Sequence, residues 1–325
     1  MALIYNIHMK QAYKYSDIWL QPKECCVDTR KQISTNVQLK DWNFKLPIVP
    51  ANMLCTIDEK LSNILADNGY FYIYHRFEDT LSFCKNKHNS NRLNSISVGV
   101  KKDDYDLINE IFNHGIVPHF ITIDIAHGHT DRVRQMIGHI RTHFGNKTTI
   151  IAGNVCTKAG VRYLEDAGAD IIKVGIGQGG ACTTKYKTGF TLPMFTCVEE
   201  CVSASQVPII ADGGIEHNGD IAKALVGGAT MVMAGGMFAR LYDSPAPLTF
   251  TGYKEYFGSA SIRTKIHTQS DNNNIEGTTR TFEEVKMTYL EKMKEIEEDL
   301  QSAISYAGGI CCEALLNVNY VYYRD

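Results

Sequence analysis

One cysteine of this sequence lies in a setting that suits covalent chemistry. The apolar run 171–174 leads into a glycine-rich loop, residues 175–180, and Cys182 follows it with Thr183 and Thr184 directly after. Glycine lets the backbone approach a ligand closely, and a cysteine at the tip of such a loop can act as a nucleophile. Free cysteines are also common as small packing residues. The residue type alone therefore leaves both roles open for Cys182.

Two further places combine glycine with the end of an apolar run. Asp212 precedes Gly213 and Gly214, so a carboxylate that suits a ribose diol stands beside backbone amides that suit a phosphate. Gly235 and Gly236 close the following run, in the region where many α/β barrels bind phosphate. Both patterns also occur in ordinary turns, so their weight depends on the fold that carries them.

Acidic and imidazole side chains complete the candidates. Asp124 ends another apolar run, and His127 and His129 follow it without a third ligand at a metal-binding spacing. We therefore expect the two histidines at the surface or behind the site. Glu276 lies in a polar stretch, and its carboxylate reaches a site only if that stretch folds over it.

Apolar or β-branched runs recur along the chain with helix-like stretches between them. Their starts lie about 20 to 37 residues apart, which is the length of one strand-plus-helix unit. Continuous rather than alternating hydrophobicity is typical of strands that are buried on both faces of a parallel sheet. Helical periodicity marks residues 58–68, 104–114 and 158–167. The predicted strands cover residues 46–50, 70–74, 95–100, 120–126, 148–155, 170–177, 207–214 and 229–236.

Eight such units in series predict an α/β fold, a (β/α)₈ TIM barrel that spans residues 1–325 as one domain. A doubly wound open sheet is the alternative, because periodicity does not prove that the sheet closes. A barrel places its chemistry on the loops after the strands, which is where Asp124, Cys182 and Asp212 fall. The polar residues 245–280 are predicted to form a flap, and residues 282–306 a helix that packs on the barrel.

The composition indicates which binding partners and which cellular compartment to expect. A net charge of −3 and a pI near 6.4 give no basic field for nucleic acid or an anionic membrane. No apolar run reaches membrane-spanning length, and residues 1–10 lack the apolar core of a signal peptide. The ten cysteines lie in unlike contexts without zinc-type CxxC spacing. We expect a reducing, cytoplasmic compartment.

Several stretches taken together resemble the IMP dehydrogenase/GMP reductase family. Within it, the shorter bacterial-type GMP reductases are the most similar group, and the resemblance runs from about residue 15 to residue 322. The matching stretches are residues 49–53, 121–129, 151–155, 175–184, 212–214, 231–236, 254–261, 299–301 and 306–309.

The resemblance implies an oxidoreductase that converts GMP and NADPH into IMP, ammonia and NADP⁺. It implies that Cys182 attacks C2 of the guanine ring and forms a covalent thioimidate, which hydride from NADPH then resolves. Thr184 matches the threonine that passes a proton to the departing ammonia. Glu276 matches the glutamate that polarises this threonine.

The resemblance also implies the binding residues and a homotetramer. The possible site of a monovalent cation such as K⁺ is expected at Gly177, Gly179, Cys182 and Lys185. The nucleotide is expected at Met53, Asp212, Gly213, Gly214, Gly235, Gly236, Gly258, Ser259 and Ala260. The cofactor is expected at Asp124, Ile125, Ala126, Asn154, Gly175, Ile176, Ala211, Asp212, Gly213, Gly214 and Ala234.

The cysteine loop departs from the family pattern at two positions. Gln178 and Gly180 stand where relatives usually have proline and serine. The loss of serine removes a hydroxyl that contacts the substrate phosphate in relatives, so phosphate binding relies more on backbone amides. The loss of proline relaxes the loop around the expected cation site.

Two other functions are compatible with such a barrel. IMP dehydrogenases usually carry a regulatory domain pair after the second unit, where this chain has only residues 77–94. They also use an Arg-Tyr pair to activate water, whereas Arg263 is followed here by Thr264. A non-catalytic purine-nucleotide binder is the second alternative, and it would have no need of a nucleophile.

Overall fold

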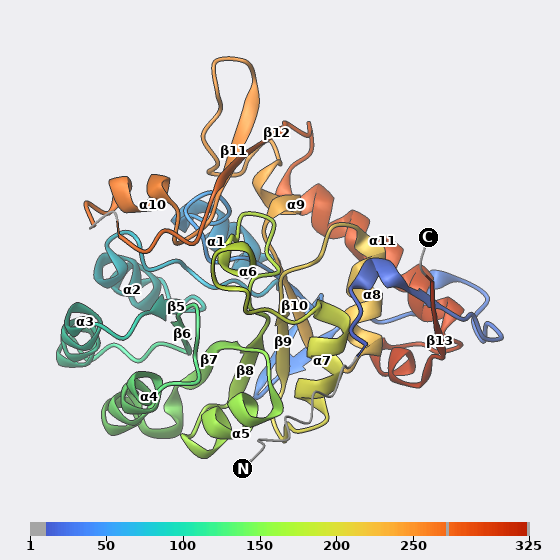
Figure 1. Cartoon of the computed structure of the whole chain (residues 1–325), viewed down its shortest axis with the longest axis horizontal. Helices are drawn as coiled ribbons and strands as arrows, with labels where there is room; N and C mark the ends of the chain where they lie inside the picture. The colour runs from blue at the N-terminus through green and yellow to red at the C-terminus, as the bar shows by residue number, and fades with distance from the viewer. Residues whose placement is uncertain (1–10, 271–272, 324–325) are drawn as a thin grey trace, which may run out of the picture.

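Seven parallel strands form a curled sheet at the centre of the structure (Figure 1), a computed structural model that describes residues 11–270 and 273–323. Most of their residues are buried, as continuous apolar sequences predict. The strands are β4 (Ile48–Pro50), β5 (Ser95–Val98), β6 (Phe120–Asp124), β7 (Thr149–Val155), β8 (Ile171–Val174), β9 (Ile209–Asp212) and β10 (Met231–Ala234). They pair in the order β4-β10-β9-β8-β7-β6-β5, so seven of the predicted strands are confirmed.

The predicted strand at residues 70–74 is wrong as a regular strand. The segment is buried, yet it pairs with β5 only through an isolated bridge between Tyr74 and Ile96. Side-chain hydroxyls form some of the hydrogen bonds that the backbone forms between regular strands. Ser97 Oγ donates to the Tyr74 carbonyl at 2.6 Å, and the Tyr72 hydroxyl donates to the Leu93 carbonyl.

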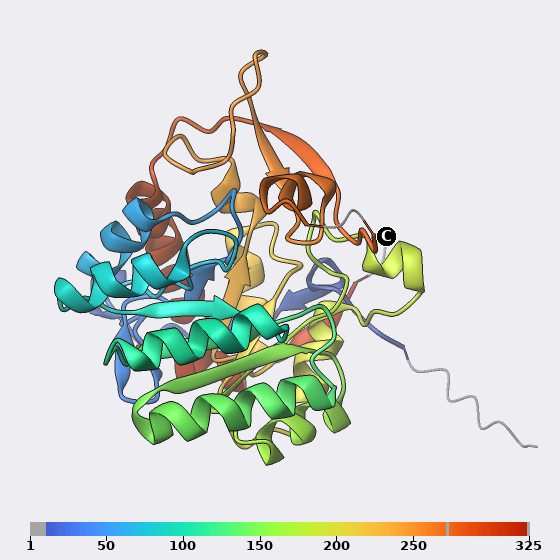
Figure 2. The same ribbon diagram turned by 90° about the vertical axis from the view of Figure 1, so that its left-hand side faces the viewer.

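Helices surround the curled sheet, which gives the TIM-barrel-like α/β fold that the repeating units predict (Figures 1 and 2). Local caps set several helix starts. Asp58 accepts from the Leu61 amide at 2.7 Å and Thr157 from the Gly160 amide at 3.1 Å. The helices are α1 (Glu59–Asp67), α2 (Thr80–Asn89), α3 (Lys102–Asn113), α4 (Asp131–Phe144), α5 (Lys158–Asp166), α6 (Thr184–Thr188), α7 (Met194–Val202), α8 (Asn218–Val226), α9 (Gly236–Ala239), α10 (Ile262–His267) and α11 (Tyr289–Tyr306).

The amino-terminal end of the barrel is closed by a small hairpin, β2 (Val37–Leu39) and β3 (Trp42–Phe44). The ring of Phe44 lies 4.8 Å from that of Phe71, which lies 4.9 Å from the ring of Phe120 at the start of β6. A further antiparallel pair, β1 (Ile18–Leu20) and β13 (Tyr320–Tyr322), joins the two ends of the described chain. These contacts leave the opposite end of the barrel for a site.

The polar residues after β10, which were predicted as a flap, form a hairpin and a short helix. Strands β11 (Tyr253–Phe257) and β12 (Thr279–Glu283) pair in antiparallel register, with α10 between them in the chain. Both views place this hairpin and α10 together at one end of the barrel (Figures 1 and 2). The predicted flap, residues 245–280, includes residues 271–272, which lie outside those that the structure describes.

The last long helix begins later than predicted. Residues 282–288 were expected in it, but Phe282 and Glu283 belong to β12 and α11 begins at Tyr289. Thr288 stops the helix from extending backwards, because it exchanges capping hydrogen bonds with Glu291. No helix within the described ranges is long and apolar enough to span a bilayer.

Candidate active site

A cavity of about 260 Å³ opens at the carboxyl ends of the barrel strands. Ala211 and Lys185 do not line it: Ala211 is fully buried within β9, and Lys185 lies one residue beyond Thr184, the residue of α6 that does line the cavity. The other residues that the sequence analysis assigns to catalysis, nucleotide, cofactor or cation line this one cavity: Met53, Asp124, Ile125, Ala126, Asn154, Gly175, Ile176, Gly177, Gly179, Cys182, Thr184, Asp212, Gly213, Gly214, Ala234, Gly235, Gly236, Gly258, Ser259, Ala260 and Glu276.

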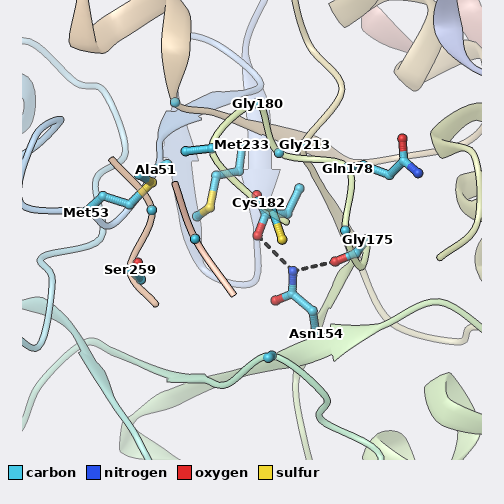
Figure 3. A pocket seen from close by; sticks show the side chains of 18 of the residues that line it. Ala51, Met53, Asn154, Gly175, Gln178, Gly180, Cys182, Gly213, Met233 and Ser259 are labelled. Atoms are coloured by element: carbon cyan, nitrogen blue, oxygen red, sulfur yellow. Dashed lines mark hydrogen bonds between the residues drawn. The ribbon is translucent and has the colours of Figure 1, made fainter. Parts of the chain in front are cut away.

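The close view places Cys182 near the middle of this group (Figure 3). Met53 and Ser259 lie on one side of the thiol, and Gly175 and Gln178 lie on the other. The side chain of Gln178 points away from the thiol and donates to Thr191 Oγ1 at 2.7 Å. Gln178 therefore takes part in holding the loop, while its backbone contributes to the cavity wall.

Cys182, Thr184 and Glu276 form a hydrogen-bonded chain. Cys182 Sγ donates to Thr184 Oγ1 at 3.2 Å, and Thr184 Oγ1 donates to Glu276 Oε2 at 2.6 Å. The thiol, hydroxyl and carboxylate are thus arranged so that a proton can pass between sulfur and carboxylate through the hydroxyl.

Backbone contacts hold the two segments that carry this chain together. Cys182 forms an isolated antiparallel bridge with Gly277. The Thr183 amide donates to the Glu276 carbonyl at 2.8 Å, and the Thr278 amide donates to the Ala181 carbonyl at 2.8 Å. The polar segment after α10 therefore folds over the cysteine loop, which is the condition that Glu276 needs to reach the site.

A buried lysine lies among the carboxylates of the cavity. Lys173 on β8 is 2% exposed, and its Nζ lies 2.8 Å from Asp124 Oδ1 and 2.7 Å from Asp212 Oδ2. Burial alone lowers the pKa of Lys173, but the charges of Asp124 and Asp212 outweigh this effect and hold the pKa above its usual value. Burial alone raises the pKa of Asp124, yet Lys173 holds it below its usual range. Lys173 and Asp124 are therefore both ionised at neutral pH.

Amide side chains complete this network. Asn154 Nδ2 donates to Asp212 Oδ2 at 2.9 Å and to the Gly175 carbonyl at 2.7 Å (Figure 3). Asn52 Nδ2 donates to Asp124 Oδ2 at 3.0 Å. Asn154 Oδ1 is buried without a hydrogen-bond partner among the described residues, so it presents an acceptor for which a ligand donor is the natural partner.

Two glycines are required by close backbone contacts. Gly175 has φ +124°, and a Cβ there would lie 2.2 Å from the Asp212 carbonyl oxygen. Gly213 has φ +103°, and a Cβ there would lie 2.9 Å from the Gly179 amide nitrogen. Larger residues at either position would separate the loop after β8 from the loop after β9.

Sequence reasoning did not assign Lys173, Asn52 or Tyr256 to the site, although all three line the cavity. A lysine inside the apolar run 171–174 was the available signal for Lys173, because a buried strand rarely carries an unpaired charge. Tyr256 lies on β11 with a buried side chain, and a Cβ on Gly235 would lie 2.5 Å from its hydroxyl.

The arginine, lysine and histidine side chains near the strand ends lie in different settings. Arg76 lines the cavity and its Nε is buried without a partner among the described residues, whereas Lys101 and Lys102 are exposed and lie outside it. His127 and His129 lie 6.3 Å apart, measured between ring centroids. Across the ranges that the structure describes, no group of three His, Cys, Asp or Glu side chains could hold a metal ion.

Known proteins match the chain over nearly its whole length. The family model for the IMP dehydrogenase / GMP reductase domain matches residues 12–315. A GMP reductase of Staphylococcus aureus (strain Newman) is 47% identical over 320 residues, which cover 96% of this chain and 97% of the relative. A GMP reductase of Shouchella clausii (strain KSM-K16) is 46% identical over 324 residues, which cover 98% and 97%. The chain belongs to the IMP dehydrogenase/GMP reductase family.

Proposed function

We propose that this protein is an enzyme that reductively deaminates GMP to IMP and ammonia with NADPH as the hydride donor. The observation that carries the proposal is the chain from Cys182 Sγ through Thr184 Oγ1 to Glu276 Oε2 at the mouth of the barrel. The relatives named GMP reductase, at 46–47% identity, support the choice of substrate.

The first step that we propose is the release of ammonia. Cys182 Sγ forms a bond to C2 of the guanine ring, the bond between C2 and the exocyclic nitrogen breaks, and the thiol proton leaves with that nitrogen as ammonia. The product is a thioimidate on Cys182. Thr184 and Glu276 move the proton, because their hydrogen bonds connect the thiol to a carboxylate that can hold it.

In the second step C2 receives hydride and the bond between C2 and sulfur breaks, which yields IMP and the Cys182 thiolate. A reduced nicotinamide dinucleotide, when bound at the cofactor side, would supply this hydride. Cys182 then regains a proton through Thr184. Covalent capture is favourable chemically because it divides a difficult displacement into two easier steps.

The nucleotide half of the cavity is assigned to residues after β9, β10 and β11. Asp212 Oδ2 is already occupied by Lys173 and Asn154, while Oδ1 has no hydrogen bond within the described chain and can accept from a ribose hydroxyl. Gly214, Gly235 and Gly236 offer backbone amides for phosphate, whereas the Gly213 amide already donates to the Met233 carbonyl at 3.3 Å. Met53, Gly258, Ser259 and Ala260 are assigned to the purine.

The cofactor half is assigned to Asp124, Ile125, Ala126 and Asn154, with the remaining cofactor residues of the sequence analysis nearby. The unpartnered Asn154 Oδ1 fits a nicotinamide, because a carboxamide presents an N–H₂ donor. Carbonyl groups of the cysteine loop are assigned to a monovalent cation such as K⁺. Gly177 and Lys185 lie close together in this loop, because a Cβ at Gly177 would lie 3.2 Å from the Lys185 amide nitrogen.

A reductase is favoured over an IMP dehydrogenase by the surroundings of Arg263. Its Nη2 lies 2.6 Å from Glu255 Oε2, its side chain is half exposed, and it does not line the cavity. This position gives no support to a role in activating water. We further propose one domain in which residues 245–270 and 273–280 form a mobile flap, a homotetramer, and a cytoplasmic location, which the ten free thiols support.

Activity and binding together test the function. The purified protein should consume NADPH, followed by its absorbance, only when GMP is present. Cys182→Ala should abolish this turnover and still bind GMP, whereas Cys156→Ala, which changes a half-buried thiol outside the cavity, should remain active. Oxidation of IMP by NAD⁺ without GMP-dependent loss of NADPH would contradict the proposal, and turnover by Cys182→Ala would exclude the covalent step.

A further inference from the structure

Lys173 connects the two halves of the cavity through a single ammonium group. It lies on β8, with Asp212 on the neighbouring strand β9 and Asp124 two strands away on β6. Its Nζ contacts one oxygen of each carboxylate, at 2.7 Å and 2.8 Å. Both carboxylates are partly exposed to the cavity, while Lys173 itself is buried.

The two carboxylates have different partners beyond Lys173. Asp124 also accepts from Asn52 and lies in the electrostatic field of Arg76. Asp212 also accepts from Asn154, and among the described residues no other cation contacts it. The loss of the ammonium group would therefore leave Asp124 near a cation and Asp212 without one.

We propose that Lys173 is a positioning residue that neutralises the carboxylates of Asp212 and Asp124 together, so that Asp124 on the cofactor side disturbs nucleotide binding at Asp212 only when Lys173 is lost. This inference rests on the function proposed above, in which Asp212 binds the ribose. With Lys173 present, the two carboxylates are held together and Asp212 Oδ1 is directed to the ligand. Without it, two partly buried carboxylates repel each other and an anionic nucleotide.

Nucleotide affinity with compensating substitutions tests this role. The probe is IMP without cofactor, and its Kd is measured by isothermal titration calorimetry on variants whose folding is checked by circular dichroism. Lys173→Met should raise the Kd at least about tenfold, because it leaves buried charge uncompensated. Asp124→Asn alone should change the Kd less than about threefold, because Lys173 still neutralises Asp212.

The decisive variant combines the two substitutions. Lys173→Met with Asp124→Asn should bind IMP at least about threefold more tightly than Lys173→Met alone, although Asp124 lies on the cofactor side. A lysine that only fills space would not be rescued in this way. Lys173→Gln serves in the same comparison if Lys173→Met does not fold.

The results distinguish this inference from the proposed function. A Kd for Lys173→Met within about twofold of wild type, or no tightening in the double variant, overturns the inference. Such results would leave GMP-dependent NADPH consumption by the wild-type protein untouched. If the wild-type protein binds no IMP at all, the proposed function fails with the inference.

Discussion

Glu276 accepts a hydrogen bond from Thr184 although 92 residues separate them in the chain. The contact joins the start of α6 to the segment before β12, and two backbone hydrogen bonds beside it fix their distance. The carboxylate is therefore brought to the cysteine by the polar segment that covers the cavity. If that segment moves away, Thr184 loses its acceptor.

Glu276→Gln should lower kcat for GMP by about 100-fold or more, the usual contribution of a general acid–base group. The Kd for GMP should change little, because Glu276 is assigned to proton transfer rather than to binding. Steady-state assays and calorimetry measure the two quantities. Glu283→Gln, an exposed change on β12, is the control and should have wild-type kcat. A kcat within about threefold of wild type for Glu276→Gln would remove this residue from the mechanism.

Gly180→Ser should strengthen GMP binding by about three- to tenfold, because it supplies a hydroxyl donor near the expected phosphate. The position has room, since a Cβ there meets only Tyr256 Cε1, at 3.6 Å. The Kd for GMP from calorimetry is the measurement. Gly175→Ser is the matched comparison and should fail to yield folded protein, because its Cβ collides with the Asp212 carbonyl. Equal or weaker GMP binding by Gly180→Ser would place the phosphate elsewhere.

Because of Lys87, the free energy of unfolding should change with pH in the alkaline range. Its side chain is buried, its Nζ donates to Ser62 Oγ at 2.8 Å, and burial lowers its pKa to about 8. The unfolded chain keeps the ordinary lysine pKa, so between pH 8 and about 10.5 it binds more protons than the folded chain, and stability rises with pH. Below pH 8 both states are protonated, and the full penalty of burying the charge applies.

Lys87→Met should therefore remove a penalty of up to about 3 kcal/mol at pH 7 and less at pH 9.5. Urea unfolding of both proteins at the two pH values gives the difference. Lys102→Met, at an exposed lysine on α3, should show no such dependence. A difference between Lys87→Met and wild type that stays constant with pH would contradict the prediction.

Thiol labelling should separate the cysteine of the site from the core cysteines. Burial raises the pKa of Cys55 and of Cys84 to about 12, so iodoacetamide at pH 8 should leave both unmodified while it labels Cys182 and the exposed Cys25. IMP at ten times its Kd should slow labelling of Cys182 about tenfold by mass action and leave Cys25 unaffected. Peptide mass spectrometry follows each site, and equal protection of Cys25 would indicate a general change of conformation instead of occupancy.

The barrel could be predicted because buried parallel strands leave a continuous apolar signature and their connections have regular lengths. Residues 70–74 have the same signature but pair with β5 only at Tyr74, and the Ser97 and Tyr72 hydroxyls donate to carbonyls of the two segments. The start of α11 depends on one local cap at Thr288, which the apolar stripe of the helix does not report.

The site residues at strand ends could be predicted by type, and the contacts between them could not. The spacing of residues in the sequence does not predict a role for Glu276. Its carboxylate reaches Thr184 because β11 and β12 pair, and these strands lie far along the chain from Thr184. Lys173 lies within an apolar strand, and the sequence does not show that Asp124 and Asp212 lie close enough to neutralise its charge. The contacts between charged residues that are far apart in the sequence are thus the part of this site that sequence patterns do not predict.

The contacts of Gly175 with the Asp212 carbonyl and of Gly213 with Gly179 have a consequence for redesign. They lock the two loops backbone to backbone, so inserting or deleting one residue in either shifts nucleophile and carboxylate together. Transplanting the cysteine loop into another barrel would require the partner loop as well. The segment between β11 and β12 would have to be transplanted with them, because its backbone also hydrogen-bonds to the cysteine loop at Ala181 and Thr183.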